Sequence, residues 1–562
     1  MIIDGSTVDA DLSADVAVIG AGPAGIVTAL EVAAAGFDVL ILESGRDRYD
    51  EKTQSLGDAA EWDSSLHAPM SLATRRQIGG ASTIWGGRCV PYDPVDFDRR
   101  PWVTDHDWPV SYDELAPLFQ RACDWFVCGR AVFDAARTGN LAESIVPGLP
   151  NEEVGTSGLE RWSLPTNFGS RYRDRLRRSS RVRLVTGITC TEIAVRTDGA
   201  DVDHLVCKTR KGRQIKVRAR RHVIACGGLE STRLLLASRH PGGRALGNHS
   251  DQLGRWYMGH VGGVVANVRF TTPPRETIHG FERDEDGVYV HRRFSFSREL
   301  QRAEELPNVT GWLVHPDLAD PRHRSGVLSF AYLALSSPAG RFLAPDALRL
   351  AMTGEPVPGV PYGFGERGST SEHLKNLGRE AGPTARFVLQ FGAKRFLTRG
   401  RRAPGFAVYN RDNLYRLQYQ GEHLPHRDSR VVLSDERDAT GVPRLRIDIR
   451  FADGDVEGAV RAHRLWDEYL RRHGAGRIEY LYDDVSEAIR ARLGAGFHQT
   501  GTTRMSAHAE DGVLDHDLAV HGLRTLHVVS SSAFPTSSQA NSTFMIVVFG
   551  LRLAAHLRKT LA

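Results

Sequence analysis

Apolar runs, glycine turns and helical stretches follow one another in a regular order at the start of the chain. Residues 16–19 are an apolar, β-branched run typical of a buried parallel strand, and residues 38–42 form a second such run. Residues 24–35 between them contain few β-branched residues and stop at Gly36, which predicts a helix. This order predicts a βαβ unit with parallel strands.

Alternation of apolar and polar positions dominates residues 181–225 and predicts an antiparallel meander. Five short strands are expected there, at 182–185, 192–195, 204–208, 214–217 and 222–225. Residues 226–231 then repeat the passage from strand through glycine into helix, with the helix expected over 232–238. This second junction is placed to approach the same ligand as the first.

The middle of the chain has weaker patterns. Ser111 opens a capping-box sequence, which predicts a helix to about Cys123. Residues 263–345 mix strand-like and loop segments, and residues 355–383 carry many Gly and Pro residues, typical of a long loop. Residues 385–402 combine apolar and basic residues in a candidate helix. We expect that helix to pack on its own protein rather than on a membrane surface or a partner.

The last part of the chain returns to regular elements. Strands are expected at 430–433, 444–449 and 525–529, and helices at 455–472 and 543–557.

A glycine motif marks the junction of the first strand and helix. Residues 20–25, GAGPAG, fit G-x-G-x-x-G: Gly20 allows the tight turn, Gly22 lets the backbone approach a pyrophosphate, and Gly25 lets helix and strand pack closely. Glu43 follows the second strand, where it can accept hydrogen bonds from ribose hydroxyls. The context favours a dinucleotide site over an ordinary βαβ unit with a glycine-rich turn.

Composition narrows the class of protein. The 562 residues are 41% hydrophobic, and 72 basic against 68 acidic residues leave a net charge of +4, which gives no case for nucleic acid. The sequence has no run of 18 apolar residues and its start lacks signal-peptide architecture, so we expect no membrane-spanning helix and a cytoplasmic location. The six cysteines form no C-x-x-C pair and are expected to be reduced. No metal-ligand spacing is present, so no metal site is predicted.

Two further segments have the composition of ligand-binding loops. Residues 79–87, GGASTIWGG, hold four glycines, which argues against a regular element and for backbone pressed against a flat ligand. Residues 496–505 read GFHQTGTTRM, and residues 530–543 read SSSAFPTSSQANST. A helix that begins just after Asn541 directs partial positive charge toward whatever binds there.

Together these segments resemble the glucose–methanol–choline (GMC) family of FAD oxidoreductases. The resemblance rests on VIGAGPAG…ILESG, on IGGASTIWGG and on HQTGTTRM…VLD…VHGL…FPT…AN, and it covers nearly the whole chain. IGGASTIW and HQTGTTRM, with Asn541 in place of a second histidine, are most similar to the pyranose oxidase and glycoside oxidase branch. The resemblance implies an FAD enzyme that oxidises alcohols.

The resemblance also implies site residues. His498 is expected to take the hydroxyl proton, a task that suits a neutral imidazole, and Asn541 to donate the hydrogen bond that orients the substrate oxygen. His260 is expected to be structural. The glycine motif and the resemblance assign FAD binding to Gly20, Gly22, Pro23, Ala24, Gly25, Glu43, Ser44, Gly79, Gly80, Ser82, Thr83, Trp85, Gly86, Gly87, Ser531, Ser542 and Thr543.

Two positions depart from the family pattern. Fungal pyranose oxidases bond FAD through a histidine at the position of Ile84, so non-covalent FAD is predicted here. Ser530 stands where many members have Asp, and a serine still offers donors to the phosphates or the flavin.

The predicted fold class is α/β, of mixed α+β character: a Rossmann-like FAD-binding domain interleaved with a substrate domain built on an antiparallel sheet. The FAD-binding domain is expected over 1–104, 181–262 and 495–562, and the substrate-binding domain over 105–180 and 263–494.

The predicted reaction is FAD-dependent oxidation of a secondary hydroxyl of a sugar, glycoside or aminocyclitol to a ketone, with oxygen or a quinone-like molecule as electron acceptor. The alternatives are a GMC-type dehydrogenase of another primary or secondary alcohol, including antibiotic-pathway sugars, a flavin-dependent lyase, and a non-catalytic flavin-binding module. The sequence leaves oxidase against dehydrogenase open, and it allows a homo-oligomer.

Overall fold

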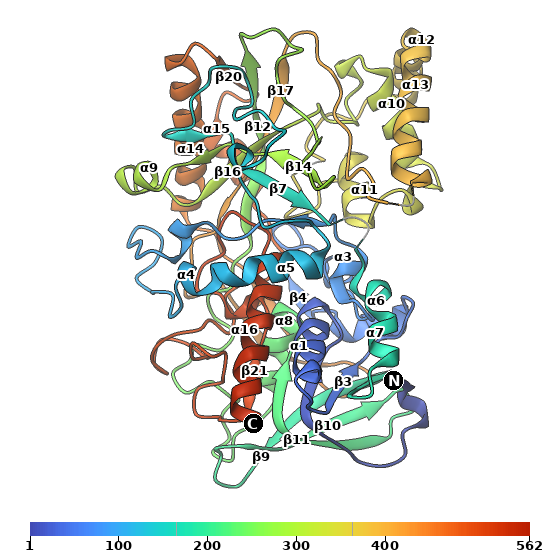
Figure 1. Cartoon of the computed structure of the whole chain (residues 1–562), viewed down its shortest axis with the longest axis vertical. Helices are drawn as coiled ribbons and strands as arrows, with labels where there is room; N and C mark the ends of the chain where they lie inside the picture. The colour runs from blue at the N-terminus through green and yellow to red at the C-terminus, as the bar shows by residue number, and fades with distance from the viewer. Residues whose placement is uncertain (164–165, 362, 399) are drawn as a thin grey trace.

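The computed structural model describes residues 1–163, 166–361, 363–398 and 400–562 (Figure 1). Its largest sheet has eight strands, in the order β1-β8-β3-β2-β11-β10-β9 with β21 beside β11. These strands are β1 Ile2–Asp4, β2 Leu12–Ile19, β3 Val39–Glu43, β8 Val182–Thr186, β9 Ile188–Val195, β10 Val202–Thr209, β11 Gln214–Ile224 and β21 Leu526–Val528. The mixed α/β class is therefore confirmed.

The opening βαβ unit forms as the sequence predicts. β2 and β3 pair in parallel, and the apolar residues of both runs are buried. Helix α1 (Pro23–Ala34) places Pro23 at its first position, where a missing N–H is tolerated. The terminal helix α16 (Thr543–Leu561) packs along α1, and the Thr28 hydroxyl donates to the Gly550 carbonyl oxygen across the two helices at 3.3 Å. Figure 1 shows the first and last helices side by side.

The predicted meander is correct only in part. β9, β10 and β11 are antiparallel, but β8 pairs in parallel with β3, and β11 pairs in parallel with β2. The two strands expected at 214–217 and 222–225 are one strand. Its polar middle, residues 218–221, is partly exposed, so the sequence pattern breaks where the backbone pairing continues.

A second body, built on antiparallel strands, occupies the upper half of Figure 1. Its main sheet has the order β16-β17-β12-β20, with β12 His260–Phe270, β16 Val309–Val314, β17 Leu414–Glu422 and β20 Gly476–Tyr480. Helix α14 (Asp453–Arg472) packs on this sheet through an apolar face that includes the buried Trp466. His260, the first residue of β12, forms an isolated bridge with Gly494, just before the segment that contains His498.

Several local expectations need correction. The glycine-rich loop contains a 3-10 turn, Gly80–Thr83, and the supposed loop at 355–383 contains helix α12 (Thr370–Arg379), which a Ser369–Glu372 capping box starts. Helix α13 covers Ala381–Gly392, earlier than expected. Ser111 does cap a helix, but Pro117 divides it into α4 (Tyr112–Leu115), a 3-10 turn and α5 (Phe119–Phe126).

All six cysteines are free thiols. Within the described ranges, no helix is both long and apolar enough to cross a bilayer.

Candidate active site

A cleft opens at the carboxyl ends of the parallel strands, where ligands bind in open α/β sheets. Gly20 and Glu43 line it from the ends of β2 and β3, and residues 225–228 line it from the end of β11. Ser531 and Thr543 close it from the end of the chain. Four segments remote in sequence therefore meet at this edge of the sheet.

The glycine loop has the shape that a pyrophosphate needs. A Cβ on Gly22 would meet no atom within 4 Å, so the backbone there faces open space. A Cβ on Gly25 would collide with the carbonyl oxygen of Gly20, so Gly25 serves the close packing of helix on strand. The first N–H groups of α1 have no partner within the helix and face the cleft, as an anion requires. These residues fit FAD.

The Glu43 carboxylate holds the glycine loop and is also expected to bind the ribose. Its carboxylate accepts hydrogen bonds from the backbone N–H groups of Ala21 at 2.8 Å and Gly45 at 2.7 Å, which fixes the glycine loop. An ionised carboxylate offers about four acceptor positions, so capacity remains for ribose hydroxyls.

The structure brings most of the expected cofactor residues together. Those that line the cleft are Gly20, Gly22, Pro23, Ala24, Glu43, Ser44, Gly80, Ser82, Trp85, Ser531, Ser542 and Thr543. Those that do not line it are Gly25, Gly79, Thr83, Gly86 and Gly87. Gly79 instead donates its N–H to the Ala21 carbonyl oxygen at 2.8 Å, and Thr83 donates its hydroxyl to the Gly80 carbonyl oxygen, so both shape the loop.

The sequence did not identify the charged residues of this cleft. Arg76 and Glu230 form an ion pair on its wall, and Arg233 pairs with Asp438 at 2.8 Å. No motif marks them, because they come from loops and a helix whose proximity depends on the fold.

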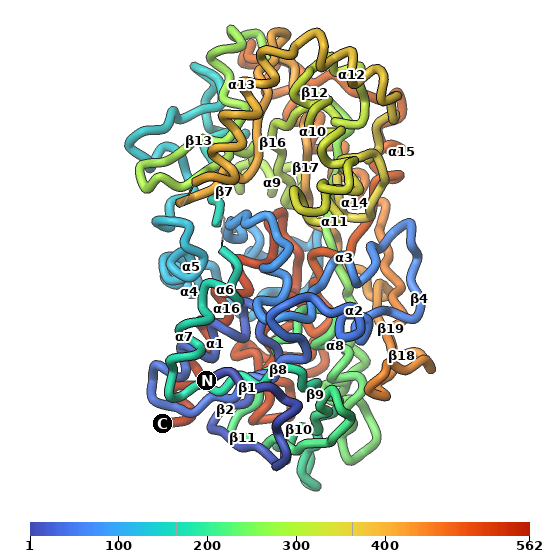
Figure 2. Tube along the Cα trace, turned by 90° about the vertical axis from the view of Figure 1, so that its right-hand side faces the viewer, coloured from blue at the N-terminus to red at the C-terminus, as the bar shows by residue number. Residues whose placement is uncertain are grey.

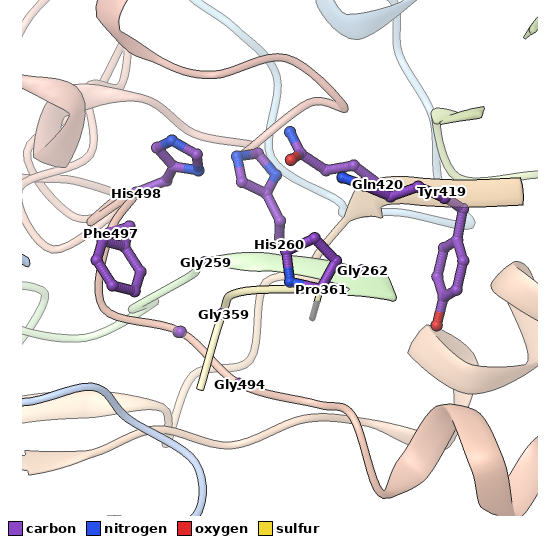
Figure 3. A pocket seen from close by; sticks show the side chains of 12 residues that line it. Gly259, His260, Gly262, Gly359, Pro361, Tyr419, Gln420, Gly494, Phe497 and His498 are labelled. Carbon is purple, nitrogen blue, oxygen red and sulfur yellow. The ribbon is translucent and has the colours of Figure 1, made fainter. Parts of the chain in front are cut away.

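A second, smaller pocket adjoins the cleft, and Phe497 lines both. Figure 3 shows the imidazole rings of His498 and His260 facing each other in this pocket, with Gln420 nearby. The ring centroids are 4.7 Å apart and the planes are nearly perpendicular, at 73°. The histidine expected to be catalytic therefore has a second histidine at its edge.

The surroundings of His498 keep its ring neutral. Burial, and secondarily the guanidinium of Arg88, lower the pKa of His498 to about 4. At neutral pH the imidazole can therefore accept a proton.

Asn541 lies just before α16 and is held by two donors. Its Oδ1 accepts from Arg88 Nη1 at 2.8 Å and from Gln420 Nε2 at 3.2 Å. Arg88 is itself buried, ion-paired with Glu160 and placed over the ring of Trp312 at 4.6 Å. Because the amide oxygen is occupied, the Nδ2 group of Asn541 is left to donate.

His260, for which a structural role is expected, also lines the pocket. Its side chain is 9% exposed, and neither ring nitrogen has a hydrogen-bond partner among the described residues. Burial, followed by His498 and Arg88, lowers the pKa of His260, so this ring is also neutral. Unpaired buried polar atoms are costly, so these nitrogens are available to pair with a water molecule or with a substrate hydroxyl.

Negative charge is missing from the pocket lining. None of the described lining residues is Asp or Glu. Two buried carboxylates on neighbouring strands, Glu160 and Glu422, are ion-paired with Arg88 and Arg100. The pocket is therefore neutral to positive.

Comparison with known proteins also indicates an FAD-dependent oxidoreductase. Residues 15–299 match the family described as FAD dependent oxidoreductase, and residues 425–550 match the family described as GMC oxidoreductase. A 2-methyl-1,2-propanediol dehydrogenase of Mycolicibacterium austroafricanum is 22% identical, over 97% of this chain and 95% of the relative. A paromamine 6'-oxidase of Streptomyces fradiae is 30% identical, over 47% of this chain and 56% of the relative.

Solved structures share the fold across the whole length. Pyridoxine 4-oxidase from Mesorbium loti superposes with a TM-score of 0.54 at 17% identity, covering 98% of this chain and 99% of the other. A formate oxidase gives a TM-score of 0.54 at 15% identity, covering 99% and 100%. With a family match that spans half of the sequence, this chain belongs to the FAD-dependent oxidoreductases, and its carboxy-terminal match places it in the GMC family, whose members oxidise CH–OH groups.

Proposed function

We propose that this enzyme oxidises a secondary hydroxyl of an uncharged sugar, glycoside or related polyol to a ketone. The observation that carries the proposal is the paired His498 and His260 in a pocket that adjoins the FAD cleft at Phe497. FAD, when bound, supplies the acceptor for the hydride that leaves the substrate carbon.

The chain's own residues then handle the hydroxyl group. A ring nitrogen of neutral His498 takes the hydroxyl proton while the C–H bond breaks with its electron pair. Asn541 Nδ2 donates a hydrogen bond to the substrate oxygen, and its orientation is fixed because Arg88 and Gln420 hold Oδ1. His260 pairs with the substrate through a nitrogen that otherwise has no partner, and so positions it against His498.

The charge of the pocket narrows the substrate class. Two relatives carry names that give paromamine and 6'''-hydroxyparomomycin C as substrates, which supports a sugar-like alcohol. In this chain, however, an ammonium group in the pocket would lose water without gaining a carboxylate, and would lie near Arg88. Of the predicted classes, uncharged sugars are therefore favoured over aminocyclitols.

Matched sugar pairs test the reaction and the charge preference together. We expect D-glucose to bleach the bound flavin in anaerobic stopped-flow mixing at pH 7.5. We expect 6-amino-6-deoxy-D-glucose, which keeps every secondary hydroxyl and is protonated at this pH, to do so with at least a tenfold lower second-order rate constant. Methyl glucoside and its 6-amino-6-deoxy analogue give a second pair. Faster reduction by the amino sugars contradicts the charge argument, and a flavin that no sugar or polyol bleaches contradicts the proposed reaction, including its preference over a lyase.

Non-covalent FAD has its own test. Ile84 has no nucleophile, and burial raises the pKa of the Cys226 thiol in the cleft, which keeps that thiol from reacting. We expect acid precipitation of the holoenzyme to release the flavin, leaving a yellow supernatant and a white pellet. A yellow pellet that survives washing contradicts this expectation.

Whether oxygen or a quinone-like acceptor reoxidises the flavin remains a prediction, as does cytoplasmic location. A relative named as a dehydrogenase matches across the whole chain, and one named as an oxidase matches over about half of it. Reoxidation of the bleached flavin by oxygen, compared with a soluble benzoquinone, measures the choice.

A further inference from the structure

Four helices gather on one flank of the second body. They are α10 (Gly326–Ser336), α11 (Asp346–Met352), α12 (Thr370–Arg379) and α13 (Ala381–Gly392). They lie along the right-hand side of Figure 1, and Figure 2 looks onto that side. The catalytic site described above does not use their outer surface.

The exposed apolar side chains of the protein are concentrated on these helices and the turns between them. Phe342, Leu389 and Leu397 are 76%, 75% and 80% exposed. Across the described ranges, every exposed Phe or Leu side chain falls between 330 and 397: Phe330, Phe342, Leu343, Leu374, Leu389, Phe396 and Leu397. A concentration of this kind marks an interaction surface, because single exposed apolar residues are normally scattered.

Helix α13 shows two faces. Phe387 and Phe391 stack on each other and contact Phe406, with ring centroids 5.3 and 5.4 Å from it, so one face packs on the protein as the sequence predicts. Leu389 on this helix and Phe396 in the π-helical segment that follows it, Ala393–Leu397, are both exposed to solvent. The outer face of α13 is left open.

Positive charge accompanies these apolar residues. Residues 381–402 contain no Asp or Glu and six basic residues: Arg386, Lys394, Arg395, Arg399, Arg401 and Arg402. Arg395 and Arg401 donate to the backbone carbonyl oxygens of Ala403 and Val127 rather than to carboxylates. Arg386, Lys394 and Arg402 are exposed, and none has an ion-pair partner among the described residues.

We propose that this apolar–basic flank, the outer surface of α10–α13 and of the segment Ala393–Leu397, docks on an anionic lipid surface. Exposed Leu and Phe side chains enter the boundary between headgroups and acyl chains, and the basic residues pair with lipid phosphates. A second copy of the chain fits less well. A twofold contact through this flank would bring Arg386, Lys394 and Arg402 against their own counterparts.

The test measures partition of the FAD-loaded enzyme onto vesicles by co-sedimentation at 0.1 M salt. We expect binding to vesicles with 30% phosphatidylglycerol in phosphatidylcholine, little binding to pure phosphatidylcholine, and release at 0.5 M NaCl. The double variant Arg386→Gln, Lys394→Gln is expected to bind at least tenfold more weakly, because each basic residue near such a surface contributes about fivefold. The variant Leu389→Ser, Phe396→Ser should leave only weak binding that salt removes.

A matched control removes the same charge elsewhere. Arg177 and Arg178 are exposed on α7 (Arg173–Arg178), so Arg177→Gln, Arg178→Gln lowers the net charge equally without touching the flank. Its vesicle binding should equal that of the unchanged enzyme, and flavin absorbance should be the same in all variants. Equal loss in the control and the flank variant contradicts the proposal. So does a dimer, seen by light scattering, that Leu389→Ser, Phe396→Ser dissolves while vesicle binding is absent.

Discussion

Replacing His498 with glutamine is expected to slow substrate-driven flavin reduction by about 10²- to 10⁴-fold, the usual contribution of a general base. Glutamine retains hydrogen-bonding capacity and similar size but cannot take a proton. The FAD should stay bound, because His498 lines the smaller pocket and not the cleft that holds the glycine loop. The measurement is single-turnover reduction under anaerobic conditions, with flavin content read from absorbance.

The pH dependence of the flavin reduction rate tests the same role of His498. Burial and Arg88 lower the pKa of His498 to about 4, so the base is neutral, and active, at every pH above about 5. The reduction rate of the unchanged enzyme should be level from about pH 6 to 9 and fall as pH drops toward 4. His516→Gln, at an exposed position, is the control and should change nothing. An unchanged rate in His498→Gln, or a profile that rises on acidification, contradicts the assignment.

The sequence predicts the fold well where one local signal determines the structure. The β2–α1–β3 unit follows from a buried run, a glycine turn and an acid at the strand end, all within 30 residues. The pairing of β8 with β3 is not readable, because it joins two strands about 140 residues apart and its alternation resembles that of the true meander. The sequence does not predict helix α12, because Gly and Pro residues on either side obscure a short capped segment.

The sequence likewise predicts some residues of the candidate site and not others. His498 and Asn541 lie in motifs that the family resemblance marks, whereas the neighbours that define their chemistry are remote in sequence. Arg88 comes from the edge of the glycine-rich loop, and Gln420 from β17; only the fold brings both to Asn541. His260 gave a weak signal as a lone histidine at a predicted domain junction. Only the folded structure shows that both of its ring nitrogens lack a hydrogen-bond partner among the described residues.

Substituting Gly22 with valine is expected to weaken FAD binding on the order of 100-fold while leaving the protein folded. The backbone of Gly22 is extended, with φ −79°, so a side chain costs no strain there, and its Cβ would meet no protein atom within 4 Å. The added atoms instead fill the space through which the backbone approaches the pyrophosphate. Because Gly22 is the N-cap of α1 and valine caps less well, the free energy of unfolding of the FAD-free protein should fall by no more than about 1 kcal/mol. Titration of FAD into that protein, followed by quenching of flavin fluorescence, measures the affinity.

Two further glycines separate a lost ligand contact from a damaged fold. Gly378 lies in α12, and its Cβ would also meet nothing, so Gly378→Ala should preserve FAD affinity and leave stability equal or higher, by up to about 1 kcal/mol. Gly25→Ala forces a methyl group against the Gly20 carbonyl oxygen, so it should destabilise the FAD-free protein itself, by about 1–3 kcal/mol. Gly22→Val is thus the one variant of the three that we expect to lose FAD affinity without a comparable loss of stability. Normal FAD affinity in Gly22→Val would place the pyrophosphate elsewhere, and equal destabilisation by Gly22→Val and Gly25→Ala would show that the loop serves packing alone.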